Sequence, residues 1–235
     1  PPLIIIHGTP GIGKTTFAAQ FPKPLFIMVD EGGLGSNEVD AFPTAKKMED
    51  VFFAIKACLE LKPGQKDTLV IDSLSSLEML IFNHVSESNG LKRIDAINYG
   101  KGYDLALEYW HKICQACRKL LEDGIFKYVV LIAHTSITEF KNPEGESYHR
   151  YNTKLHRKTA DLFCEQSDIV GFASQPIYIK KVDSKGKDRA VAGKKGEPLL
   201  YLRETPSLVA KNRYALPDSI EFNASVFLQA LKGDK

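Results

Sequence analysis

The sequence lacks any apolar run long enough to cross a bilayer, and it lacks any stretch with the pattern of a signal peptide. It also lacks an excess of one charge, because 31 basic and 29 acidic residues give a formal net charge of +2. Any affinity for nucleic acid must therefore come from local clusters of cations. No fixed-period repeat, low-complexity tract or linker divides the 235 residues. We expect a single domain over residues 1–235, no association with a membrane and a cytoplasmic location.

Cysteine is scarce, with four residues, and its spacing does not build a disulfide or zinc framework. Cys114 and Cys117 form a C-x-x-C pair inside a strongly helical stretch, and no second pair completes a metal site. Residues three apart share one face of a helix, so we expect both thiols to pack as small hydrophobic groups. A reducing cytoplasm fits this pattern.

The opening residues carry the most specific motif. Residues 3–6 are an apolar, β-branched run that predicts a short buried strand, and residues 8–15, GTPGIGKT, match G-x-x-x-x-G-K-[ST] at every fixed position. Glycines let the backbone wrap closely around an anion, and the helix that follows directs its free N–H groups and positive dipole end at the same anion. We expect Lys14 to reach the β- and γ-phosphates of a nucleoside triphosphate and the Thr15 hydroxyl to hold Mg²⁺. The predicted nucleotide-binding residues are Gly8, Thr9, Pro10, Gly11, Ile12, Gly13, Lys14, Thr15 and Thr16.

Three later apolar strands end in polar side chains, at the edge where open parallel sheets bind ligands. The first ends at Asp30 and Glu31, of which Glu31 is favoured to orient or deprotonate the water that attacks the γ-phosphate. The second ends in Asp72, a candidate to hold a Mg²⁺-bound water. The third ends in His134, a candidate to hydrogen-bond the γ-phosphate and sense its loss. The alternatives are an acidic turn at Glu31 and a histidine that only terminates a buried strand.

Two stretches gather cations without clear hydrophobic periodicity. Residues 86–104 interleave them with Tyr99 and Tyr103, as suits a mobile loop that touches phosphates and stacks bases, although a solvated connection explains the pattern as well. Residues 135–158 predict a long basic loop at the active edge, followed by a short helix. The candidate DNA-binding residues are Lys92, Arg93, Lys101, Lys141, Arg150, Lys154, Arg157 and Lys158.

The last third of the chain changes character. Residues 177–179, 199–202 and 207–210 predict antiparallel strands, with a polar, glycine-rich tip between the first two. Lys211 and Arg213 flank Asn212, so on an extended chain they point the same way and can reach the γ-phosphate of a neighbouring subunit.

The order of these parts resembles the RecA-type recombinase core over nearly the whole chain. The elements that carry the resemblance are the phosphate-binding loop, VDEGGL, IDSLSSLE, LIAHTS and VAKNRYALP. EGGL, ID-S and AKNR together make the chain similar, more narrowly, to the short RecA-like ATPases of bacteriophages, the Sak-type single-strand annealing proteins. The resemblance implies an α/β, RecA-like P-loop NTPase fold: a mostly parallel central sheet flanked by helices, with antiparallel strands near the carboxyl terminus.

The resemblance also implies roles for single residues. Glu31 matches the glutamate that activates water, and Asp72 matches the aspartate after the third strand. His134 stands where bacterial RecA has the glutamine that couples the γ-phosphate to DNA. Lys211 and Arg213 match the pair that reaches across to the neighbour's ATP, and residues 86–104 and 135–158 match the two DNA-binding loops.

The predicted function is that of an ATP- and Mg²⁺-dependent ATPase that binds single-stranded DNA in phage homologous recombination or single-strand annealing. Its expected partners are single-stranded DNA, further copies of the chain in a ring or filament, and a single-strand-binding protein, in the host cytoplasm if a phage encodes it. A P-loop small-molecule or nucleoside kinase is one alternative, with the long basic loop as its lid. A nucleotide-switched adaptor with little hydrolysis is another.

Overall fold

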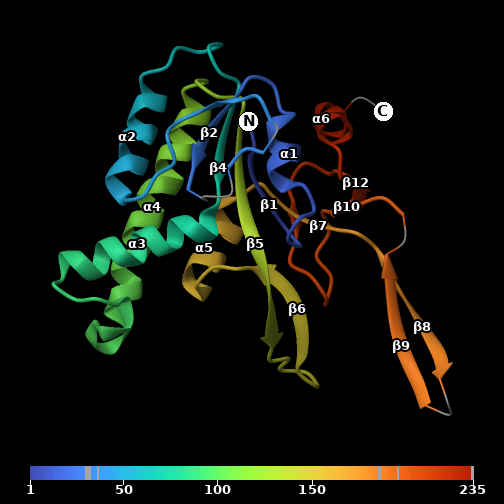
Figure 1. Ribbon diagram of the computed structural model, residues 1–235. Helices are drawn as coiled ribbons and strands as arrows, with labels where there is room; N and C mark the ends of the chain where they lie inside the picture. Colours follow the sequence, from blue (N-terminus) through green and yellow to red (C-terminus); the bar gives the residue numbers. More distant parts are fainter. Residues whose placement is uncertain (30–32, 36, 185–186, 195, 234–235) are drawn as a thin grey trace.

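The centre of the structure is one large twisted sheet (Figure 1). The computed structural model describes residues 1–29, 33–35, 37–184, 187–194 and 196–233. Within them, a ten-stranded sheet has the order β12-β10-β7-β1-β5-β4-β2-β3, with β11 paired to β7 and β6 paired to β5. Its parallel strands are β1 (Leu3–Gly8), β2 (Pro24–Met28), β3 (Asp40–Ala41), β4 (Thr68–Asp72), β5 (Tyr128–Phe140) and β7 (Ile169–Ser174).

The strand order brings the predicted polar residues to one edge. β5 lies between β1 and β4, with Gly8 opposite His134 on one side and Asp72 opposite Ile132 on the other. Because these strands are parallel, their carboxyl ends lie side by side. The sheet therefore places the end of β1, His134 and Asp72 at a common edge.

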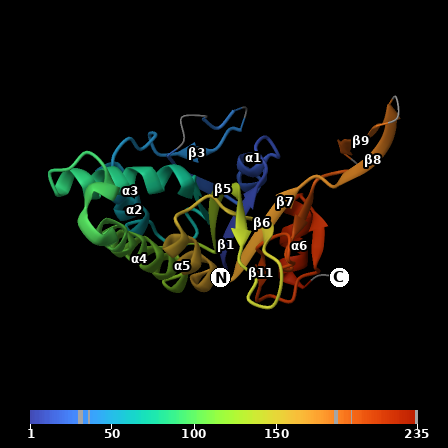
Figure 2. The same cartoon turned by 90° about the horizontal axis from the view of Figure 1, so that it is seen from below.

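Helices cover both faces of the sheet. Their bounds are α1 (Lys14–Ala19), α2 (Met48–Leu59), α3 (Leu74–Ser88), α4 (Lys101–Glu122), α5 (Arg157–Gln166) and α6 (Ala224–Lys232). Side chains of β1 alternate between two cores: Leu3 and Ile5 pack with α2–α5, while Ile4 and Ile6 pack with α1 and α6. Figure 2 shows α2–α5 gathered on one side and α6 on the other. No helix in the described part of the chain is both long and apolar enough to span a membrane.

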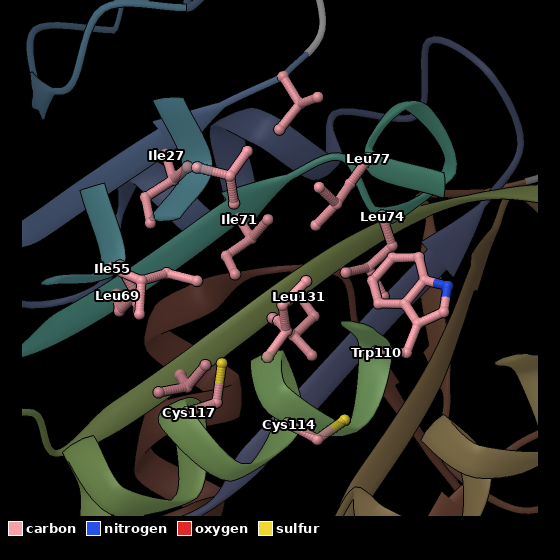
Figure 3. Packing of buried hydrophobic residues seen from close by; sticks show 14 of the residues in the cluster. Ile27, Ile55, Leu69, Ile71, Leu74, Leu77, Trp110, Cys114, Cys117 and Leu131 are labelled. Carbon is pink, nitrogen blue, oxygen red and sulfur yellow. The ribbon is translucent and has the colours of Figure 1, made fainter. Parts of the chain in front are cut away.

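The larger core includes Trp110 of α4, which is fully buried (Figure 3). Cys114 and Cys117 follow on the same helix and pack into the same core as free thiols. Burial raises the pKa of Cys114 to about 12 and raises the pKa of Cys117 as well, so both stay protonated and unreactive at neutral pH. Both side chains pack as small hydrophobic groups, as predicted.

The prediction of a long loop over residues 135–158 is wrong. β5 continues to Phe140 and pairs antiparallel with β6 (Tyr148–Thr153), which forms a hairpin that extends past the edge of the sheet (Figure 1). Little of the hairpin faces the core, so its strands lack the alternation of apolar and polar residues that marks a half-buried strand. Its content of threonine, isoleucine and aromatic residues is nevertheless typical of strands.

The carboxyl-terminal strands are antiparallel as predicted, but several bounds differ. β8 (Ile177–Ser184) and β9 (Lys187–Lys194) form a hairpin of their own that includes most of the predicted tip. β10 (Leu199–Tyr201) pairs with β7 and with β12 (Ser219–Glu221), and β11 (Lys211–Asn212) also pairs with β7. Residues 207–210 are not a ladder strand; they run beside β6, where the Tyr151 N–H donates to Ser207 O at 2.8 Å. The predicted α/β fold with a mostly parallel sheet is confirmed.

Candidate nucleotide-binding site

The phosphate-binding loop connects β1 directly to α1, in the context that its motif requires. Gly13 has a φ of 98°, in the left-handed region that favours glycine, and α1 starts at the next residue. Gly8 is required for another reason: a Cβ at this position would lie 2.3 Å from the carbonyl oxygen of Ala173 on β7. This first glycine therefore lets β1 and β7 approach closely, which the motif alone does not reveal.

Lys14 is buried, and its ammonium group lies over the loop. Its Nζ donates to the carbonyl oxygens of Gly8 at 3.1 Å and Thr9 at 3.2 Å. Phosphate oxygens bound in the loop would compete with these neutral acceptors, and a charged acceptor makes the stronger hydrogen bond. Pro10, Gly11 and Thr16 are exposed, so this side of the loop is accessible.

Thr15 and Asp72 meet across the site. The Thr15 hydroxyl donates to a carboxylate oxygen of Asp72 at 2.7 Å, although the two residues are 57 positions apart. Asp72 ends β4 and is only 5% exposed. A hydroxyl and a carboxylate are hard oxygen donors of the kind that Mg²⁺ takes beside a triphosphate, so this pair fits the predicted metal.

His134 is held by its backbone beside the loop. It lies opposite Gly8 in the sheet, its N–H donates to Ser75 Oγ at 3.0 Å, and its carbonyl accepts from the Lys154 N–H at 2.8 Å. Ser75 lies in the first turn of α3, so it fixes this strand end against the helix that follows Asp72. Sequence reasoning missed Ser75, for which the only signal was its place shortly after that aspartate. Glu31 lies outside the described residues, and its role stays a prediction.

Lys211 and Arg213 lie toward the opposite end of the parallel strands. Lys211 pairs with Val170 of β7, and its Nζ donates to the carbonyls of Cys164 at 2.6 Å and Glu165 at 2.9 Å, where α5 ends. Burial and the neighbouring Arg213 lower the pKa of Lys211. Arg213 is 3.5 Å from a carboxylate oxygen of Asp168, just before β7 begins. Neither cation is brought to the phosphate-binding loop of its own chain, and their action on a neighbour stays a prediction.

The candidate DNA-binding cations fall into two groups. Lys92, Arg93 and Lys101 lie around two short 3₁₀ turns, Ile94–Ala96 and Asn98–Gly100, in a connection that is shorter than predicted because α3 runs to Ser88 and α4 begins at Lys101. Arg93 forms a fork with Asp95, at 3.1 and 2.7 Å. Tyr99 is 97% exposed here.

The second group surrounds the β5–β6 hairpin and α5. Lys141, Arg150 and Arg157 line one cavity of about 650 Å³ between these elements. Arg150 is only 13% exposed, since its guanidinium pairs with Glu204 at 2.5 Å and lies over the Phe140 ring. Lys154 is exposed, whereas Lys158 pairs with Asp104 and so ties α5 to α4. Arg150 is thus held against the surface by its ion pair and the Phe140 ring.

Comparisons with known proteins found similar solved structures and one matching family. Solved structures that resemble this chain include an ATPase domain, with 11% identity, coverage of 90% of this chain and 84% of that chain, and a TM-score of 0.41. Flagellar accessory protein FlaH from Methanocaldococcus jannaschii has 12% identity, coverage of 89% and 86%, and a TM-score of 0.38. A DnaB-like replicative helicase, solved in a study of its interactions with primase, has 12% identity, coverage of 90% and 58%, and a TM-score of 0.39. No curated protein sequence matches the chain.

The AAA domain family matches residues 1–214, which include the phosphate-binding loop, Asp72 and His134. The match covers most of the 235 residues. This chain therefore belongs to the AAA domain family, and its described residues form an α/β fold with a mostly parallel sheet and a phosphate-binding loop between β1 and α1.

Proposed function

We propose that this chain is an ATP- and Mg²⁺-dependent ATPase that binds single-stranded DNA and helps complementary strands pair, in phage homologous recombination or single-strand annealing. The observation that carries the ATPase part is the 2.7 Å contact between Thr15 and Asp72. It joins the end of the phosphate-binding loop to the carboxylate of a second strand, as metal-assisted phosphoryl transfer requires.

In the proposed reaction, residues 8–16 bind the triphosphate of ATP. Lys14 exchanges the carbonyl oxygens of Gly8 and Thr9 for phosphate oxygens. Thr15 would hold Mg²⁺ directly and Asp72 would hold it through water; when bound, the ion neutralises charge that develops on the phosphates. Glu31 is proposed to orient the attacking water.

The proposed link to DNA runs along β5. One continuous strand leads from His134, beside the phosphate-binding loop, to Phe140 in the projecting hairpin. A hydrogen bond from His134 to the γ-phosphate would therefore favour one conformation of the hairpin, and the hairpin also carries cations that face solvent. Lys141, Lys154 and Arg157 are exposed on or beside this hairpin and supply the proposed phosphate contacts.

The proposal includes assembly of several copies. Lys211 and Arg213 lie away from their own phosphate-binding loop, so a head-to-tail contact is what would bring them to ATP on the next copy. A cation supplied in this way typically accelerates phosphoryl transfer by about 10³–10⁵.

The test is the rate of ATP hydrolysis per chain, measured over a dilution series with and without oligothymidylate. We expect slow hydrolysis at high dilution and a rise with protein concentration and DNA, with Lys14→Ala as the inactive control. A rate per chain that stays constant across the series would contradict both assembly and DNA stimulation. Transfer of the γ-phosphate to a small molecule would identify a kinase, and negligible hydrolysis unchanged by Glu31→Gln would identify an adaptor.

A further inference from the structure

His7 is a polar residue in an otherwise apolar strand, directly before the first glycine of the phosphate-binding loop. It is 0% exposed. Leu3 and Ile5 on the same face of β1 pack into the larger core, so this face carries hydrophobic side chains up to His7. A polar side chain buried this deeply has to be fully hydrogen-bonded.

Both ring nitrogens of His7 have partners. Nε2 lies 3.0 Å from the carbonyl oxygen of Val209, which only accepts, so Nε2 carries the hydrogen. Nδ1 lies 3.0 Å from Thr135 Oγ1, so it accepts from that hydroxyl. Burial lowers the pKa of His7 to about 4, which keeps the ring neutral. The ring also packs on Phe172, which stacks on Tyr151 of β6.

These contacts join three segments that are far apart in the chain. Thr135 follows His134 and belongs to the part of β5 that pairs with β6. Val209 donates its N–H to the Tyr151 carbonyl of β6 at 3.0 Å and lies two residues before Lys211. His7 itself adjoins Gly8, so one side chain connects the phosphate-binding loop, the base of the hairpin and the approach to Lys211.

We infer that His7 is a positioning residue whose neutral ring fixes the β5–β6 hairpin and the segment before Lys211 against the strand that carries the phosphate-binding loop. Nucleotide binding and the geometry of the hairpin are coupled through this tie, a consequence that rests on the proposed function. Removing the bond to Thr135 loosens the base of the hairpin, and removing the bond to Val209 loosens the segment before Lys211, without removing a phosphate ligand.

The test compares amide hydrogen exchange over residues 135–153 and 204–213 in the full chain. The variants are His7→Phe, which keeps an aromatic ring but no hydrogen bond, and Thr135→Val, which removes only the hydroxyl. Thr135→Val should raise exchange at the Tyr151 and Val209 amides about tenfold, as expected for one buried hydrogen bond, and His7→Phe, which removes two, should raise it at least as much. Thr135→Ser, which keeps the hydroxyl, should match the wild type.

Two controls separate this tie from general loosening of the fold. Thr138→Val makes the same change on the same strand at a residue that pairs with Arg150, away from His7, and should leave exchange at Tyr151 and Val209 unchanged. The double variant of His7→Phe and Thr135→Val should exchange no faster than His7→Phe alone at the amides of residues 135–153, because the bond that Thr135→Val removes is already absent in His7→Phe. Unchanged exchange in His7→Phe, or additive effects there, would overturn the inference.

Coupling is measured by adding Mg²⁺ and a non-hydrolysable ATP analogue. Exchange in the hairpin should slow in the wild type and in Thr138→Val, but not in His7→Phe, although that variant still binds the analogue. Equal slowing in His7→Phe would contradict the coupling. If the wild type does not bind the analogue, the proposed function fails, while the comparison without nucleotide still decides whether His7 holds the hairpin.

Discussion

The substitution Asp72→Asn removes the charge of this side chain but keeps its hydrogen bond with Thr15. Asparagine keeps a side-chain carbonyl oxygen that accepts from Thr15, but it is a poorer partner for a hydrated cation. Asp72→Asn should therefore fold normally and weaken Mg²⁺ binding about 10–100-fold, the usual cost of losing an outer-shell carboxylate. The measurement is the Mg²⁺ concentration at half-maximal ATP hydrolysis.

Asp67 provides the matched control, because it is a buried aspartate at the other end of the same strand. Its carboxylate pairs with Lys127 at 3.2 Å, away from the phosphate-binding loop. Asp67→Asn should leave the Mg²⁺ requirement unchanged. Equal shifts in both variants would mean that the requirement reports general stability and not a metal site.

The pKa of His7 predicts how stability depends on pH. It is about 4 in the folded chain and about 6.5 in the unfolded chain, so the unfolded state takes up the proton first as pH falls. The contribution of neutral His7 is complete above pH 6.5 and declines as pH falls toward 4. At pH 5 the free energy of unfolding should be about 2 kcal/mol lower than at pH 7 on this account.

Urea unfolding of His7→Phe at both pH values measures that contribution. Between pH 7 and pH 5, the free energy of unfolding of the variant should fall by about 2 kcal/mol less than that of the wild type, whatever its stability at pH 7. His111→Phe, on the exposed side of α4, changes the same residue type and should keep the dependence of the wild type. The same pH dependence in His7→Phe as in the wild type would show that another group is responsible.

Elements buried on both faces were the predictable ones. β1, β4 and the first half of β5 are continuous apolar runs, which predict buried strands. The polar residue after each run then predicts that these residues lie together at the carboxyl edge of the sheet. The β5–β6 hairpin was missed because it projects past the sheet, where packing imposes no alternation. The predicted strand over residues 207–210 failed because its apolar side chains fill a small cluster with Phe172 without a ladder beside them.

The site was predictable where its chemistry is local in sequence. The phosphate-binding loop needs only adjacent residues, so the motif identifies it, and Asp72 follows from one strand end. Ser75 and His7 act through partners 59 and 128 positions away, and a single sequence does not indicate such contacts. The same holds for Arg150, because the sequence does not indicate that its guanidinium pairs with Glu204 and that its side chain is therefore mostly covered.

Of the cations on or beside the hairpin, we expect Lys154 to contact DNA and Arg150 to stabilise the fold instead. Lys154 is exposed, so Lys154→Met should reduce the slope of log affinity for oligothymidylate against log salt by about 0.7, the value for one phosphate of a single strand. Arg150→Met should leave the slope unchanged. It should instead lower the thermal midpoint by about 2–4 °C, the shift for about 1 kcal/mol in a chain of this size.

Salt titrations of binding, together with thermal melting of both variants, measure these effects. Each substitution removes one positive charge, at Arg150 within β6 and at Lys154 directly after it, so each is the charge-matched control for the other. A reduced slope in Arg150→Met would place that guanidinium on DNA, and an unchanged slope in Lys154→Met would remove Lys154 from the interface.

Assembly is the level at which Lys211 and Arg213 acquire their proposed role, because neither is close to its own phosphate-binding loop. A subunit with Lys14→Ala cannot use ATP but still presents both cations, whereas a subunit with Arg213→Ala binds ATP but presents only one of them. Each variant alone should hydrolyse ATP far more slowly than the wild type, by up to about 10³–10⁵ for loss of a cation supplied across an interface.

Mixing the two variants should then restore activity. In a mixed assembly, some Arg213→Ala subunits, whose nucleotide sites are intact, lie next to a Lys14→Ala subunit that supplies Arg213. Hydrolysis should therefore exceed the sum of the separate rates. It should first rise and then fall as the fraction of Lys14→Ala subunits increases. The control mixes Arg213→Ala with a chain that carries both substitutions, which offers no cation. Activity equal to the sum in both mixtures, with assembly verified by light scattering, would mean that Arg213 serves only its contact with Asp168 at the start of β7.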